Sequence, residues 1–148
     1  MIYIVHKSQR TELLGRNLDE YVQVATVHGV FKDFYKAYQV LVYSPYKDRA
    51  AFDAAVQESI KGFEANLAKL NGLLGNKEFI AGGITWIDFA VADFMQVLNS
   101  LSEEYLKPFP KLAEYQKRVW SLPELKNYFS SDKFQQKPIN GTAALWRG

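Results

Sequence analysis

Two long stretches with apolar residues at helical spacing constrain this chain more than any other feature. The first follows Asn17 and ends at Ser44–Pro45, and its apolar residues recur at steps of three and four: Val27, Val30, Phe31, Phe34, Tyr38 and Leu41. The second ends at Gly72 and Gly75 and keeps the same spacing: Phe52, Val56, Ile60, Phe63, Leu67, Leu70 and Leu74. Because such steps place side chains on one face, we expect two long amphipathic helices.

Capping residues indicate where the helices begin. Asn17 is suited to accept the backbone N–H of Glu20, and Glu20 to reach back to Asn17. A second capping box is expected at Thr85 and Asp88, where Asp takes the place usually held by Glu or Gln. We interpret Thr85 and Asp88 as a structural cap that contributes about 1–2 kcal/mol.

Shorter helices are expected from about Pro110 to Ser121 and from Pro123 to Ser130, each with proline at its first position. Residues 8–15 are polar and loop-like, and residues 133–148 look irregular. Residues 2–5 fit either a short strand or the last turn of a helix. Since no other segment alternates like a strand, the sequence predicts an all-α bundle of about five helices.

Composition argues against several classes of function. The chain has 148 residues, no cysteine, and only His6 and His28 as histidines, so we expect no metal site. Lys and Arg are scattered singly and the formal net charge is +2, which argues against nucleic-acid binding. No apolar run approaches the ~18 residues that span a membrane. We therefore expect a cytoplasmic protein that binds no membrane.

The segment FIAGGITWIDF, residues 79–89, closely resembles the signature of cytosolic glutathione transferases. Residues 109–112, FPKL, are similar to the start of that family's next helix. The tail, with NYFSSDKF at 127–134, Lys137–Pro138 and AALW at 143–146, resembles the mu class, with the sigma class next. The resemblance covers nearly the whole chain and implies the helical C-terminal domain of that family.

The resemblance also implies how the chain is organised. Residues 1–8 would be the end of a missing thioredoxin-like domain, and residues 9–148 the helical domain. Glutathione would be a co-substrate held by the missing half, so we expect no cofactor in this chain and no catalysis by it alone. The helical half would line the electrophile pocket and the interface of a homodimer. The alternative is a non-catalytic docking or structural subunit of a larger protein assembly.

The resemblance suggests four residues or segments near the pocket. Tyr43 would face the electrophile as the catalytic and substrate-binding candidate, or else be a tyrosine packed on the core with its hydroxyl in water. Trp146 and the tail would cover the pocket. Asp33 would reach glutathione across a dimer, or be a solvated carboxylate beside Lys32 and Lys36.

Three further expectations concern the family pattern and the surface. Asp93 matches a family aspartate that we interpret as structural. Asn140 and Gly141 stand where mu-class relatives often carry a larger apolar residue. Finally, we expect residues 2–5 and the Val27–Tyr38 face to need covering by another domain or chain.

Overall fold

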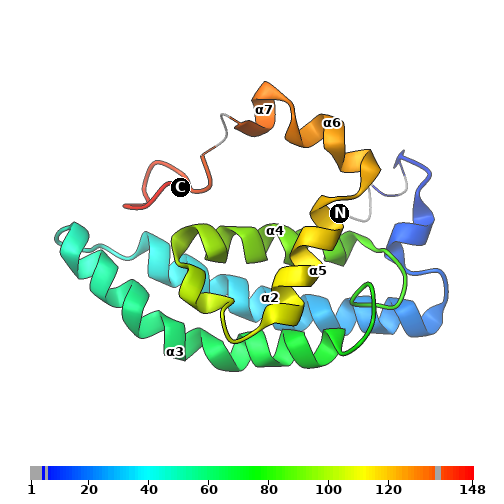
Figure 1. Ribbon diagram of the computed structural model, residues 1–148, viewed down its shortest axis with the longest axis horizontal. Coiled ribbons are helices and arrows are strands. Elements are labelled where there is room, and N and C mark those ends of the chain that lie inside the picture. The colour runs from blue at the N-terminus through cyan, green and yellow to red at the C-terminus, as the bar shows by residue number, and fades with distance from the viewer. Residues whose placement is uncertain (1–4, 6, 136–137) are drawn as a thin grey trace.

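Two long helices and two shorter ones form the body of the protein in a computed structural model that describes residues 5, 7–135 and 138–148 (Figure 1). The main helices are α2 (Leu18–Tyr43), α3 (Arg49–Leu74), α4 (Trp86–Leu101) and α5 (Pro110–Trp120). Shorter elements are η1 (Thr11–Leu14), η2 (Glu103–Tyr105), η3 (Pro123–Leu125), α6 (Lys126–Phe129) and α7 (Asp132–Gln135). The described residues include no strand, and the prediction of an all-α bundle is confirmed.

The starts of α2 and α3 follow from side chains that satisfy free backbone N–H groups. Asn17 Oδ1 accepts from the Glu20 amide at 2.9 Å. The Glu20 carboxylate accepts from the Arg16 amide at 2.8 Å instead of returning to Asn17, so that half of the predicted capping box is wrong. The sequence interpretation missed the cap of α3, where Asp48 accepts from the Ala51 amide at 2.8 Å.

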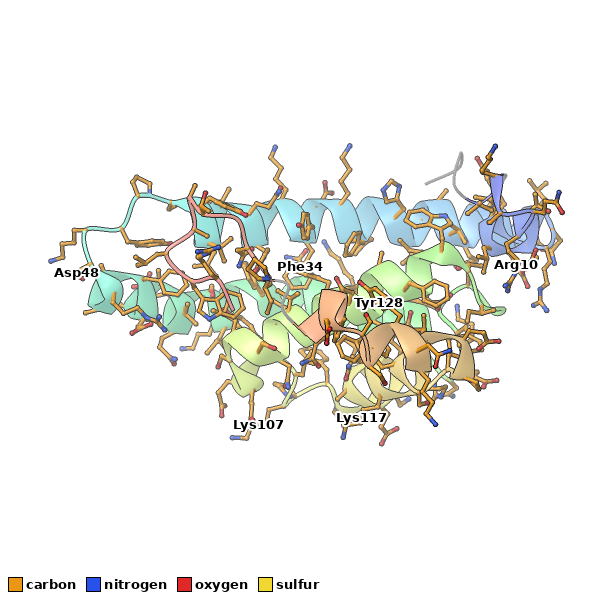
Figure 2. All side chains as sticks on the ribbon, turned by 90° about the horizontal axis from the view of Figure 1, so that it is seen from above. Arg10, Phe34, Asp48, Lys107, Lys117 and Tyr128 are labelled. Atoms are coloured by element: carbon orange, nitrogen blue, oxygen red, sulfur yellow. The ribbon has the colours of Figure 1, made fainter. Side chains whose placement is uncertain are left out.

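The core lies where α2, α3 and α4 meet. Phe34 of α2 is fully buried, and its ring meets those of Phe63 and Phe94 edge-on, with centroids 5.0 Å apart in each case (Figure 2). Val27 and Tyr38 are buried beside it. The expectation that another domain or chain must cover the Val27–Tyr38 face is therefore wrong, because α3 and α4 already bury these side chains.

Smaller departures occur near the two ends. Thr11–Leu14 forms a 3-10 turn inside the expected loop. The helix expected over 123–130 is η3 followed directly by α6, and the short α7 was not expected. Val5 and Lys7 are helical, whereas the rest of the 2–5 segment lies outside the described residues.

Candidate functional site

A cavity of about 300 Å³ lies between α2, α4 and the C-terminal tail. Its walls are mostly aromatic or aliphatic, with one carboxylate and one amide. The lining residues are Phe31, Tyr35, Tyr38, Ala90, Asp93, Phe94, Val97, Ile139 and Asn140. A small space with apolar walls and a few polar groups is the usual setting for binding a flat apolar molecule.

The tail closes this cavity because it is hydrogen-bonded to the C-terminal half of α2. Asn140 Nδ2 donates to the Tyr38 hydroxyl at 2.8 Å, and that hydroxyl donates to Asn140 Oδ1 at 3.2 Å. Within the tail, Asn140 Nδ2 also donates to the Trp146 carbonyl at 3.2 Å. The Gly141 amide donates to the Tyr43 hydroxyl at 3.0 Å. Figure 1 shows the tail returning over this part of the bundle. The bonds between Asn140 and Tyr38 and between Gly141 and Tyr43 join the tail to α2, and we call them the tail latch.

The tail is also folded on itself. The Ile139 amide donates to the Arg147 carbonyl at 2.8 Å, and the Ala144 amide donates to the Gly141 carbonyl at 3.1 Å. Residues 139–147 thus form a compact loop. The side chains of Ile139 and Asn140 face the cavity from this loop.

Both tyrosines of α2 that line the cavity keep their protons. Burial raises the pKa of Tyr38, against the smaller opposing effect of its hydrogen bond to Asn140. Burial also raises the pKa of Tyr35, and the nearby Tyr43 and Asp93 add to this effect. The cavity therefore contains neutral phenols, which do not act as bases at neutral pH. The Tyr38 hydroxyl already donates to Asn140 Oδ1 at 3.2 Å.

A second cavity of about 400 Å³ lies along α4 beside the first and shares Ala90 and Asp93 with it. Its walls come from the N-terminal segment, α4, α5 and the α6 region. They are Val5, Ser8, Leu13, Trp86, Phe89, Ala90, Asp93, Val119, Trp120, Leu125, Tyr128 and Phe129. Aromatic rings thus flank the Asp93 side of α4 in both cavities.

None of the three candidate residues Tyr43, Trp146 and Asp33 lines the cavity. Tyr43 and Trp146 hold Gly141 and Asn140, which belong to the tail that closes it. Asp33 is exposed on α2 and forms no salt bridge within the described part of the chain. Sequence reasoning assigned Tyr38 to the core and missed its bond to Asn140, since no local pattern joins them.

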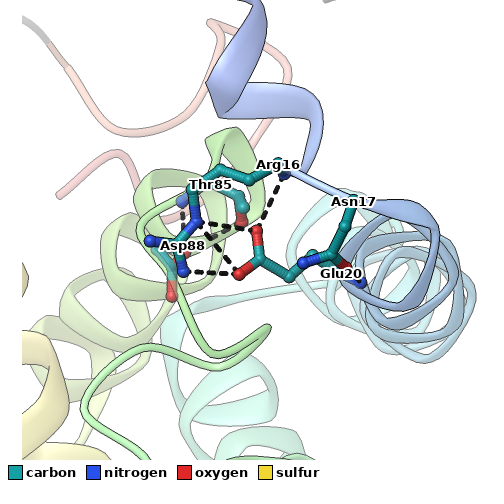
Figure 3. A network of polar contacts seen from close by, with 5 residues as sticks. All are labelled: Arg16, Asn17, Glu20, Thr85 and Asp88. Carbon is teal, nitrogen blue, oxygen red and sulfur yellow. Dashed lines mark hydrogen bonds and ion pairs between the residues drawn. The ribbon is translucent and has the colours of Figure 1, made fainter.

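Thr85 and Asp88 lie at the other end of the molecule, at the start of α4 (Figure 3). Asp88 Oδ2 accepts from the Thr85 amide at 2.8 Å and from the Thr85 hydroxyl at 2.9 Å. Asp88 Oδ1 accepts from the Ile80 amide and from the Tyr115 hydroxyl, each at 2.8 Å. Asp88 therefore joins the loop before α4, α4 itself and α5.

The described residues contain no group of three or more histidine, cysteine or acidic side chains that could hold a metal ion. None of the helices in the same part of the chain is long and apolar enough to cross a membrane.

Residues 32–132 match the family model described as "Glutathione S-transferase, C-terminal domain". This match covers more than half of the chain, and it includes α3, α4 and α5 in full. The chain belongs to this family. Its all-α bundle is thus that of a glutathione transferase C-terminal domain.

Individual relatives agree with this assignment. The chain is 26% identical over 137 residues to the Fasciola hepatica glutathione S-transferase class-mu 26 kDa isozyme 51, covering 92% of this chain and 61% of the relative. It is 29% identical over 135 residues to glutathione S-transferase P 1 of Bufo bufo, covering 88% and 61%. The chain thus spans about three fifths of the length of these relatives.

A solved structure gives the same fold. The Pi-class glutathione S-transferase of Onchocerca volvulus superposes with a TM-score of 0.78 at 24% identity, covering 96% of this chain and 68% of that one. At this identity the likeness establishes the fold alone.

Proposed function

We propose that this chain is the helical half of a glutathione transferase and that its tail-closed cavity receives the apolar electrophile. The observation that carries this proposal is the cavity between α2, α4 and the tail, with aromatic walls and neutral phenols. Apolar walls favour a flat organic molecule, and a phenol hydroxyl stabilises negative charge that develops on it.

Glutathione would bind outside this chain, on a thioredoxin-like half to which residues 1–8 would belong. Activating a thiol requires a hydrogen-bond donor aimed at the sulfur, together with backbone amides that hold the peptide. The cavity residues supply a place for the second substrate and do not include such a set. In this proposal the protein works in the cytoplasm as a homodimer with glutathione as co-substrate.

Tyr43 has an indirect role in this proposal. Its hydroxyl accepts from the Gly141 amide, so its own proton is free to point elsewhere, toward a bound electrophile or water. The immediate effect of Tyr43 is to hold the tail over the cavity. Trp146 belongs to the tail itself, and its carbonyl accepts from Asn140 Nδ2, which fixes the Asn140 side chain within the tail loop.

The first test measures catalysis and binding on the isolated chain. We expect no conjugation of glutathione to an aromatic halide above the buffer rate and no retention on glutathione resin. Enzyme-like turnover that is lost on heating would contradict the assignment of glutathione binding to another half.

The second test concerns the cavity. An aromatic halide should quench tryptophan fluorescence saturably, and Phe31→Ala should weaken that binding several-fold because it removes a cavity wall. Val40→Ala, on the exposed side of α2, is the matched control and should leave binding unchanged. If Phe31→Ala and the unmodified chain bind the aromatic halide with equal affinity, the cavity is not the binding site for the electrophile.

A further inference from the structure

The chain contains two Asn-Gly pairs, Asn71–Gly72 and Asn140–Gly141. Asparagine is thermolabile because the backbone nitrogen of the next residue can attack its side-chain carbonyl carbon. Glycine in the next position favours this attack, since it has no Cβ to hinder it and adopts many backbone conformations. The two pairs have the same local sequence, so their surroundings decide how fast each reacts.

The tail latch restrains both reacting groups of the second pair. The Gly141 amide, which would be the nucleophile, donates its hydrogen to the Tyr43 hydroxyl at 3.0 Å. The side-chain nitrogen of Asn140 donates to the Tyr38 hydroxyl and the Trp146 carbonyl, its side-chain oxygen accepts from the Tyr38 hydroxyl, and the residue is only 6% exposed. Attack on the side chain therefore requires that the tail first leave α2.

The first pair is restrained differently. Asn71 and Gly72 lie inside α3, and the Asn71 carbonyl accepts from the Gly75 amide at 2.9 Å. Releasing this pair requires melting the end of a long helix that packs on the core. The tail is held by far fewer bonds, so it should open more often than α3.

We propose that Asn140 is a deamidation site that reacts when the tail opens and then keeps the tail open. The Gly141 nitrogen loses its proton and bonds to Asn140 Cγ, the bond from Cγ to Nδ2 breaks, and ammonia leaves. A five-membered succinimide results. Water then opens either of its carbonyls, which gives aspartate or isoaspartate at position 140. Water is the only co-reactant, and no atom changes its oxidation state.

The product re-forms the latch only in part. A carboxylate at position 140 can still accept from the Tyr38 hydroxyl, but it has no N–H to donate to that hydroxyl or to the Trp146 carbonyl. Closing the tail would also bury a negative charge beside the Trp146 carbonyl, at a position that is only 6% exposed. Isoaspartate adds a backbone atom and shifts the loop as well. Ile139 and residue 140 would then cease to close the cavity, independently of any catalytic role.

The main experiment is a time course of native protein at mildly alkaline pH, followed by tryptic peptide mass spectrometry. Peptide 134–147 reports Asn140, and the fragment ions of peptide 70–77 distinguish Asn71 from Asn76. We expect Asn140 to deamidate faster than Asn71 in the folded chain, and both to react at similar rates in denaturant. Equal rates at the two sites in the folded chain would overturn the proposal.

Two variants test the role of the latch. Tyr43→Phe removes the acceptor for the Gly141 amide and should speed deamidation at Asn140 by roughly fivefold, the effect of losing one hydrogen bond. The rate at Asn71 should not change. Gly141→Ala is the matched control, because the added Cβ would lie 3.5 Å from the Tyr43 hydroxyl, an ordinary contact. It should keep the latch and suppress the reaction.

The consequence is measured by hydrogen exchange on Asn140→Asp. The amides of Ile139 and Gly141, protected by the Arg147 carbonyl and the Tyr43 hydroxyl, should exchange faster, whereas those of α3 should not. Asn140→Ala removes the side-chain hydrogen bonds without adding charge, so the difference between Asn140→Ala and Asn140→Asp measures the effect of the charge. If the tail amides exchange at the same rate in Asn140→Asp as in the unmodified chain, the proposal is refuted. It is also refuted if Tyr43→Phe leaves the deamidation rate of Asn140 unchanged.

Discussion

Asp88 makes more hydrogen bonds in the structure than the capping pattern in the sequence indicates. The sequence indicates a cap, which involves only the Thr85 amide and hydroxyl. In the structure its other oxygen also accepts from the Ile80 amide and the Tyr115 hydroxyl, and the side chain is fully buried. The same bond and burial raise the pKa of Tyr115, with burial as the larger cause. Removing Asp88 would therefore leave several buried donors unpaired.

We predict that Asp88→Ala lowers the free energy of unfolding by about 3 kcal/mol or more, above the 1–2 kcal/mol of a cap alone. Denaturant unfolding followed by circular dichroism measures this directly. Tyr115→Phe, which removes one of the bonds, should cost about 1 kcal/mol. Asp33→Ala, at an exposed site in α2, should stay within about 0.5 kcal/mol. A loss for Asp88→Ala no larger than for Asp33→Ala would mean that these bonds contribute little.

At the scale of the elements, Arg16 and Glu20 form an ion pair at the start of α2 that lies against the loop before α4 (Figure 3). Glu20 is largely buried and accepts from the Arg16 amide and guanidinium. The Arg16 guanidinium lies so close to Gly83 that a Cβ there would meet Nη2 at 2.3 Å. The absence of a side chain at Gly83 thus lets this pair form.

Acid should weaken this connection. The hydrogen bonds and charge of Arg16 lower the pKa of Glu20, so the ionised carboxylate favours the folded state. Its contribution is complete above the ordinary pKa of glutamate and is lost as the pH falls through the lowered folded value. We predict that unfolding free energies of the unmodified chain and Glu20→Gln converge on acidification. Arg16→Met should flatten the same pH dependence, whereas a pH-independent difference would contradict this origin.

The four main helices could be predicted because their signals are local. Spacing marks α2 and α3, and proline marks the start of α5. The cavity and the tail latch could not be predicted, because they depend on hydrogen bonds between residues that are far apart in the sequence. Tyr38 and Asn140 are 102 residues apart, and Tyr43 and Gly141 are 98 apart. Resemblance drew attention to Tyr43 and Trp146, but their contacts with the tail come only from the fold.

For the whole molecule, the exposed apolar surface lies at a different part of α2 from the Val27–Tyr38 face that we expected to need a partner. The Val27–Tyr38 face is covered by α3 and α4, but the first turn of α2 exposes Leu18, Tyr21 and Val22 by 74%, 53% and 50%. Positions 18, 21 and 22 lie on one side of a helix, so these side chains form a single apolar patch. We call it the α2 patch.

We predict that the chain self-associates through the α2 patch into a homodimer. Each apolar Å² hidden contributes roughly 25 cal/mol, so a second copy that covers the patch on both chains gains from it twice. Sedimentation velocity should show a concentration-dependent shift from monomer to dimer. The double variant Leu18→Glu/Val22→Glu should remain monomeric at the same concentrations, with an unchanged circular dichroism spectrum. Val40→Lys, at an equally exposed apolar residue near the other end of α2, should still dimerise. A monomer at every concentration would contradict self-association, and a dimer that survives the double variant would place the contact elsewhere.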